Sequence, residues 1–176
     1  MFGRRVKIFS LLGFEVRVDL SWVVLAVLVT WSLADGVFPD YVEGLTETAY
    51  WLMGVAGALG LFLSIILHEL SHSLVARRFG IPMKGITLFI FGGVAEMSEE
   101  APDAKAEFWM ALAGPASSLL VSSIFYLTSR YGASAGWSDP VTGVIGYLVW
   151  INIALAVFNL IPAFPLDGGR VLRSVL

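Results

Sequence analysis

The sequence lacks cysteine and has few charged residues. Without cysteine, disulfide bridges, dithiol redox chemistry and thiolate-ligated zinc are excluded, so any metal must take histidine, carboxylate or water ligands. Only 14% of the 176 residues are charged, against roughly 25% in soluble domains, whereas 57% are hydrophobic. The net charge is −3 and no basic patch with interleaved aromatic residues is found, so nucleic acid is not an expected partner.

The apolar residues gather in four long stretches, and the mean hydropathy is +0.81. These features favour an all-α polytopic membrane protein over a soluble domain with a large core. The expected transmembrane helices are residues 20–34, 50–76, 108–127 and 141–161. Residues 35–48 and 130–140 are predicted linkers. With no internal repeat, residues 1–176 are expected to form a single membrane-embedded domain.

Two segments do not fit a helical pattern. Residues 1–19 alternate apolar and polar side chains around Gly13, which predicts a hairpin; a signal peptide is disfavoured because the apolar run starts only near Leu20. Within residues 80–100, the β-branched and aromatic run 85–91, which Gly92-Gly93 breaks, predicts one or two strands or a re-entrant segment. Because unpaired strand edges cannot face lipid, this run must pair with the hairpin or line a wet cavity.

Cationic residues predict the orientation. Only Arg130 falls near the proposed outer ends. An excess of lysine and arginine marks cytoplasmic loops, so both ends of this chain and the small β element are expected on the cytoplasmic side. The ten residues near the proposed inner ends are Arg4, Arg5, Lys7, Arg17, Arg77, Arg78, Lys84, Lys105, Arg170 and Arg173.

The chain has two histidines, and both lie in one motif, His68-Glu69-Leu70-Ser71-His72, inside an apolar stretch. Helical residues four apart share a face, so both imidazoles can bind one metal ion while Glu69 serves as a proton acceptor. The pattern is short and can arise by chance in soluble chains. Ionisable groups are costly inside a membrane, however, and there they indicate a functional site.

A catalytic zinc ion usually has three protein ligands, so a third is needed. Asp167 is the predicted one, because Pro162 and Pro165 break or kink the preceding helix and Gly168-Gly169 allow unusual backbone geometry. The alternative is that Asp167 is a cytoplasmic helix cap paired with nearby arginines, Arg170 or Arg173.

Asn152 and Asn159 are seven residues apart and therefore share a helix face. Such amides either hold helices together or donate a hydrogen bond to an oxyanion beside a metal. Packing is favoured for Asn152, and both possibilities stay open for Asn159. Ala113-Gly114-Pro115-Ala116-Ser117-Ser118 is interpreted as a close-packing surface rather than as chemistry.

Together these motifs resemble the site-2 protease family of intramembrane zinc metalloproteases, in its prokaryotic type. The resemblance implies one zinc ion held by His68, His72 and Asp167, with Glu69 as the catalytic acid/base and Asn159 assisting the oxyanion. Ser118 departs from the asparagine that many relatives carry there. Similar proteins also continue with further helices, and some with nucleotide-binding CBS domains, so a C-terminal part of the full-length protein is expected beyond Leu176. The motifs that carry the resemblance are His68-Glu69-Leu70-Ser71-His72, Gly92-Gly93, Ala113-Gly114-Pro115, and residues 159–169.

The predicted function is regulated intramembrane proteolysis: hydrolysis of peptide bonds within or near transmembrane segments of membrane protein substrates in a prokaryotic cell membrane. We expect the substrate helix to unwind by pairing with strand 85–91. The alternatives are a metal-ion transporter or channel that uses the same His/Asp cluster, and a non-catalytic scaffold. A membrane peptidase with a glutamate as third ligand is disfavoured, because no glutamate follows Glu107.

Overall fold

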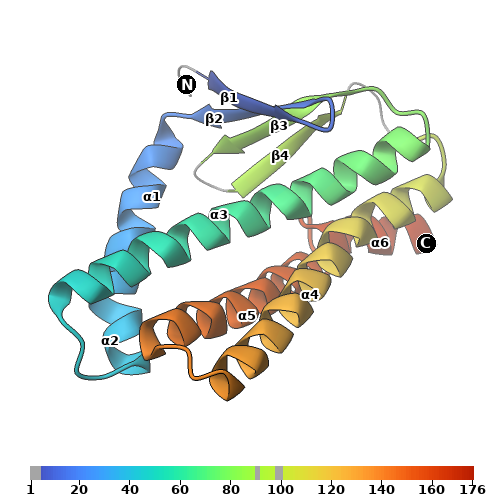
Figure 1. The fold of residues 1–176 in the computed structure, drawn as a ribbon. Helices are drawn as coiled ribbons and strands as arrows, with labels where there is room; N and C mark the ends of the chain where they lie inside the picture. Colours follow the sequence, from blue (N-terminus) through green and yellow to red (C-terminus); the bar gives the residue numbers. More distant parts are fainter. Residues whose placement is uncertain (1–4, 90–91, 98–100) are drawn as a thin grey trace.

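The computed structural model describes residues 5–89, 92–97 and 101–176. A small sheet covers one side of the long helix α3, and α4 and α5 lie on the other side (Figure 1). The elements in chain order are β1 (Arg5–Leu11), β2 (Phe14–Asp19), α1 (Ser21–Ser32), the π-helical turn η1 (Leu33–Val37), α2 (Phe38–Tyr41), α3 (Glu47–Arg78), β3 (Met83–Phe89), β4 (Gly92–Met97), α4 (Ala104–Ser134), α5 (Asp139–Asn159) and α6 (Asp167–Val175).

Four helical stretches in the described residues are long and apolar enough to cross a membrane: Ser21–Tyr41, Glu47–Arg78, Ala104–Ser134 and Asp139–Asn159. The predicted fold class, an all-α polytopic membrane protein with a small β element, is confirmed. The helices α3 and α4 are longer than the sequence pattern indicated, because their polar ends continue past the apolar residues. The predicted linker at 130–140 is therefore shorter, since α4 ends only at Ser134.

The predicted linker at 35–48 is partly wrong, because helical structure continues through η1 and α2 to Tyr41. Packing explains the difference. The Phe38 side chain is fully buried, and its ring meets that of Tyr147 on α5 edge to face, with 5.7 Å between centroids. Pro39 occupies the first turn of α2, where a missing N–H costs no hydrogen bond.

The four strands form one mixed sheet in the order β1-β2-β3-β4. The predicted hairpin is present as β1 and β2. β3 pairs in parallel with β2, with Val16 opposite Ile86, so of the two predicted possibilities the strand pairs with the hairpin. β3 ends at Phe89, before Gly92-Gly93, and β4 begins at Gly92 opposite Phe89, so of the predicted one or two strands the structure has two.

This topology also contradicts the expectation that a substrate pairs with strand 85–91. Within the described residues, β3 lies between β2 and β4 and has both edges occupied. Ile90 and Phe91, at the end of the predicted strand, lie outside the described residues. In the part of the sheet that the structure describes, β1 and β4 are the edge strands.

The sheet packs on one face of α3 and so determines which way the opposite face points. Phe14, Val16 and Ile86 from the sheet form a buried cluster with Ile66 and Leu70 of α3. On an α-helix, residues two apart point in nearly opposite directions. A residue midway between Ile66 and Leu70 therefore faces away from the sheet, toward α4.

Polar contacts between helices are few but specific. Asn152 of α5 is fully buried, and its Nδ2 donates to Ser64 Oγ on α3 at 2.9 Å and to Leu148 O at 2.8 Å. Asn152 therefore links two helices, and the packing interpretation of this residue is confirmed.

The contact between α1 and α3 depends on Gly54. A Cβ at this position would lie 2.7 Å from the backbone oxygen of Thr30 and 3.1 Å from Ala34 Cβ. We expect Gly54→Ala to lower the free energy of unfolding by about 1–3 kcal/mol, because backbone atoms must move to make room. The loss of stability is measured from thermal unfolding of the protein in detergent, with size-exclusion chromatography to monitor the fraction that stays folded. The control is Gly36→Ala, since no atom lies within 4 Å of a Cβ at Gly36. Equal unfolding temperatures for the two variants would contradict the prediction.

Candidate metal centre

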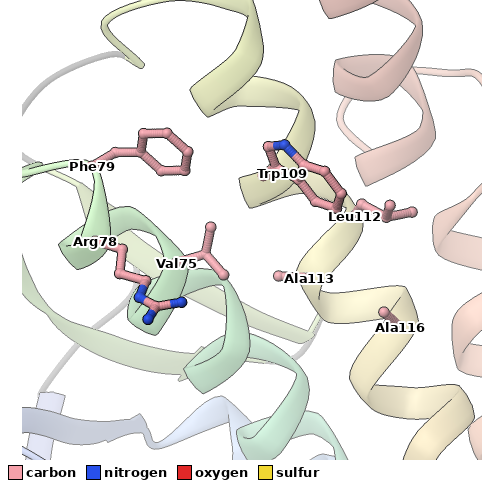
Figure 2. A pocket seen from close by; sticks show the side chains of 7 residues that line it. All are labelled: Val75, Arg78, Phe79, Trp109, Leu112, Ala113 and Ala116. Carbon is pink, nitrogen blue, oxygen red and sulfur yellow. The ribbon is translucent and has the colours of Figure 1, made fainter.

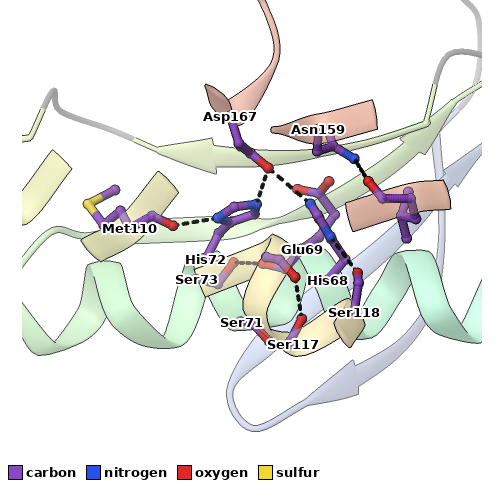
Figure 3. A network of polar contacts seen from close by, with 12 residues as sticks. His68, Glu69, Ser71, His72, Ser73, Met110, Ser117, Ser118, Asn159 and Asp167 are labelled. Atoms are coloured by element: carbon purple, nitrogen blue, oxygen red, sulfur yellow. Dashed lines mark hydrogen bonds and ion pairs between the residues drawn. The ribbon is translucent and has the colours of Figure 1, made fainter. Parts of the chain in front are cut away.

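The structure brings together the three residues that the sequence predicted as metal ligands. Asp167 Oδ2 lies 3.1 Å from His68 Nε2 and 3.2 Å from His72 Nε2. One ligand atom from each of the three residues lies within 4.8 Å of the others. All three side chains are buried, and Figure 3 shows both imidazoles and the carboxylate pointing toward one another.

His68 and His72 are one helical turn apart on α3, on the face opposite the sheet. His68 lies midway between Ile66 and Leu70, which contact the sheet. The sheet thus fixes the rotation of α3 about its axis, and this rotation turns both imidazoles toward α4 and α6.

Asp167 reaches the histidines through a tight turn that follows α5. The helix ends at Asn159, before Pro162, as the prolines predicted. Residues 160–166 then form a turn, within which Leu166 N donates to Ala163 O at 2.9 Å, and α6 starts at Asp167. The carboxylate is therefore the first side chain of a new helix.

The two glycines after Asp167 are needed for close packing and not for unusual backbone angles. Neither is among the described residues with positive φ. A Cβ on Gly168 would overlap the carbonyl oxygens of Leu160 and Ile161, and one on Gly169 would lie 2.8 Å from Ala163 O. The first turn of α6 therefore lies directly against the preceding turn.

The alternative interpretation of Asp167 as a helix cap paired with arginine is wrong. Arg173 donates to Glu107 on α4 through Nε, at 2.9 Å, and through its terminal nitrogen. Arg170 Nε lies 3.9 Å from the same Glu107 oxygen. The arginines are thus directed to α4, while Asp167 is directed to the histidines.

The second nitrogen of each imidazole is held by α4. His72 Nδ1 lies 2.6 Å from the Met110 carbonyl oxygen, and His68 Nδ1 lies 2.9 Å from Ser118 Oγ. A carbonyl oxygen can only accept, so neutral His72 carries its proton on Nδ1 and presents a lone pair at Nε2. Outer contacts of this kind fix the tautomer and ring orientation of metal-binding histidines.

These outer contacts were not predicted from the sequence. Ser118 carried a signal, because it stands where many relatives have asparagine. The Met110 carbonyl carried none, since a backbone oxygen is available on every residue.

Gly114 provides the space between α4 and the histidines. A Cβ there would overlap Nε2 of both His68 and His72. The close-packing interpretation of residues 113–118 is therefore confirmed at Gly114, which packs against the candidate ligand pair itself, whereas Ser118 in the same segment makes a polar contact with His68. Any residue other than glycine would occupy the place where the ligand atoms meet.

Glu69 and Asn159 lie beside the cluster in Figure 3. Glu69 is partly buried and follows His68 directly on α3. Asn159 Nδ2 donates to Leu155 O, one turn earlier on α5, at 2.9 Å. The asparagine amide is thus engaged within its own helix, and its assistance to an oxyanion stays a prediction.

The donor set fits zinc. Two imidazole nitrogens and one carboxylate oxygen are a combination that catalytic zinc sites use, with the fourth position left for water. Asp167 Oδ2 lies 3.1 and 3.2 Å from the two Nε2 atoms, so all three donor atoms are close enough to share one ion.

A groove of about 450 Å³ lies between the end of α3 and the first half of α4 (Figure 2). Val75, in its wall, is three residues after His72, and Ala113 precedes Gly114. None of the residues in the wall is a candidate ligand, so the groove borders the metal cluster without including it. The wall consists of Val75, Arg78, Phe79, Trp109, Leu112, Ala113 and Ala116.

Comparison with known proteins gives two curated relatives of high identity. The chain is 43% identical over 164 residues to the putative zinc metalloprotease Rip3 of Mycobacterium tuberculosis, covering 93% of this chain and 42% of that protein. It is 42% identical to the putative zinc metalloprotease sll0528 of Synechocystis, covering 99% of this chain and 45% of that protein. The chain thus spans less than half the length of these relatives.

A solved structure is also similar. The site-2 protease from Methanocaldococcus jannaschii matches with a TM-score of 0.65 and 26% identity, over 98% of this chain and 71% of that one. The family model of Peptidase family M50 matches residues 56–137 and 130–176, which include the histidine motif and Asp167. On these matches, the chain belongs to Peptidase family M50, the site-2 protease family.

Proposed function

We propose that residues 1–176 form one membrane-embedded domain, the catalytic core of an intramembrane zinc metalloprotease. It hydrolyses peptide bonds within or near transmembrane segments of membrane protein substrates. The observation that carries this proposal is the convergence of His68, His72 and Asp167 from two separate elements, in a chain with four apolar helices long enough to span a membrane. Membership of Peptidase family M50 favours this function over a transporter or channel.

In this proposal, Nε2 of His68, Nε2 of His72 and the Asp167 carboxylate hold one zinc ion. When bound, zinc lowers the pKa of a coordinated water to about 7. Ser118 and the Met110 carbonyl keep the imidazoles oriented through their Nδ1 atoms. Gly114 keeps α4 clear of the ligand atoms.

Glu69 is the general acid/base. Its carboxylate accepts a proton from the water that attacks the substrate carbonyl, and the resulting carboxylic acid donates that proton to the departing amine. Asn159 supports the carbonyl oxygen as it gains negative charge, for which Nδ2 has to leave its hydrogen bond to Leu155 O.

A substrate helix hides its carbonyl groups in its own hydrogen bonds, so it must unwind before it can be cut. An edge strand can hold an unwound segment through main-chain hydrogen bonds. In the described part of the sheet β4 is the edge strand that follows β3, and it contacts α3, the helix that carries the histidines. We therefore assign substrate pairing to β4 in place of the interior strand β3.

The N-terminus of the chain faces the cytoplasm in this proposal. The sheet, the end of α3, the start of α4 and α6 are neighbours, and they carry the cationic residues. Arg130 lies near the other end of α4. This distribution follows the positive-inside rule.

Glu69→Gln tests the chemistry. We expect the cleavage rate to fall by at least about 100-fold, because a positioned acid/base contributes roughly 10²- to 10⁴-fold, while the metal content is unchanged. The measurements are cleavage of a membrane-spanning reporter peptide in nanodiscs and metal analysis of the purified protein. Glu47→Gln is the control, since Glu47 is exposed at the opposite end of α3. Undiminished cleavage by Glu69→Gln would remove Glu69 from its assigned role.

Gly114→Ala tests the geometry of the metal centre. The added methyl group would overlap the ligand nitrogens of both histidines, so we expect zinc affinity to fall by at least about 10-fold. Competition with a chromophoric chelator measures the affinity. Gly146→Ala is the matched control, because a Cβ at Gly146 makes only an ordinary contact, 3.6 Å from the Tyr41 ring. If both variants bind zinc with the affinity of the unmodified protein, then His68, His72 and Asp167 do not form the metal site in this arrangement.

A further inference from the structure

Glu107 is a buried carboxylate that the proposed chemistry does not use. It lies in the first turn of α4, and its side chain is 11% exposed. One of its oxygens accepts two hydrogen bonds from Arg173, and Arg170 lies 3.9 Å from the same oxygen. Hydrogen bonds between guanidinium and carboxylate groups are among the strongest that side chains form.

Both arginines belong to α6, the helix that begins with Asp167. Little apolar burial holds this helix in place. Its only buried residues are Asp167, Gly168 and Gly169, while Leu172 and Val175 are 46% and 71% exposed. The glycines fix the start of α6 against the preceding turn, and the contact with Glu107 is a charge-assisted constraint on the rest of the helix.

The same stretch of α4 also holds His72. Met110, whose carbonyl oxygen lies 2.6 Å from His72 Nδ1, is three residues after Glu107 and on the same side of the helix. Two positions about one turn apart on α4 thus hold two different candidate ligands in place. Met110 contacts His72 on α3, and Glu107 binds the helix that carries Asp167.

We propose that Glu107 is a positioning residue for the metal centre. Through Arg173 it fixes α6 against α4, and this keeps the Asp167 carboxylate within reach of both imidazoles. The inference rests on the proposed metal centre and adds to it a residue that touches neither metal nor substrate.

The variant Glu107→Gln suits the test. Glutamine has nearly the same shape and leaves no buried charge on α4, and the Arg173 side chain is already 55% exposed and can turn to water. The glutamine oxygen can still accept a hydrogen bond, but the charge that strengthens the contact with Arg173 is lost, so the constraint on α6 is weakened with little effect on folding. The opposite change, Arg173→Gln, leaves a buried carboxylate with only the more distant Arg170, and Arg173→Lys keeps the positive charge.

The experiment is a titration of the metal-stripped protein in detergent with Co²⁺ and then with Zn²⁺ in competition. The visible spectrum of bound Co²⁺ reports the number and geometry of the ligands. We expect Glu107→Gln to weaken binding by roughly 10- to 100-fold, the range for outer contacts of metal ligands, and to change the Co²⁺ spectrum. Arg173→Lys should recover most of the affinity that Arg173→Gln loses. The double variant Glu107→Gln/Arg173→Gln should bind no more weakly than Glu107→Gln alone, because one interaction is removed in both.

Glu15→Gln is the matched control. Glu15 is also paired with basic residues, 2.8 Å from Lys7 and 2.6 Å from Arg17, but it lies on β2 of the sheet. Unchanged affinity and an unchanged Co²⁺ spectrum in Glu107→Gln would overturn the inference while the metal centre stands. Additive losses in the double variant, or equal losses in Glu15→Gln, would also overturn it. If the unmodified protein itself binds neither metal, the proposed metal centre fails first and takes this inference with it.

Discussion

The structure depends on one constraint: three polar ligand groups must meet inside an apolar helix assembly without leaving any polar atom unsatisfied. A buried polar group without a partner is costly, and more so where lipid replaces water. Each imidazole is therefore held through Nδ1, His68 by Ser118 and His72 by Met110, while both Nε2 atoms face the Asp167 carboxylate, where a bound cation would satisfy all three groups. Removing one of these side chains would therefore leave a polar atom of another buried without a hydrogen-bond partner.

The helix that meets this constraint is α4, which supplies none of the three ligands. Glu107, Met110, Gly114 and Ser118 are spaced by three, four and four residues, so they form one stripe along the helix. The Glu107 carboxylate binds α6, and the Met110 carbonyl oxygen contacts His72. Gly114 leaves space for the histidine nitrogens, and the Ser118 hydroxyl contacts His68. A single rigid element thus sets the distances between ligands that are 99 residues apart in the chain. A stripe of small and polar residues in a transmembrane helix is usually explained by packing, and here packing and ligand placement use the same surface.

The sheet acts on the site from the other side of α3. Its apolar side chains contact Ile66 and Leu70, which lie before and after His68. Rotation of α3 by half a turn would expose this cluster and turn the histidines toward the sheet. Arg77 contributes to the same attachment, since it donates to Leu12 O at 2.9 Å and lies over the Phe14 ring. Lys7 and Arg17 hold Glu15 in the charged form on the sheet, and the hydrogen bond from Lys7 is the largest cause of its lowered pKa. The β element therefore orients the helix as well as offering an edge strand.

The sequence predicted what depends on local pattern and on the cost of burying charge. Two histidines four apart in an apolar stretch, and an aspartate after two prolines, were enough to name the three side chains that the structure brings together. The helical course of residues 35–41 was missed, because burial of Phe38 against α5 is a tertiary effect that no local pattern reports. The reason for Gly168-Gly169 was misjudged for a related cause. Both a positive φ and a close approach require glycine, and only coordinates distinguish them. The order of the strands could not be predicted from the local pattern either. The sequence indicated that strand 85–91 needed a partner, but not that β4 would pair with its other edge. What escaped prediction in each case is a contact between two elements, which depends on how the chain folds and not on the local pattern of residues.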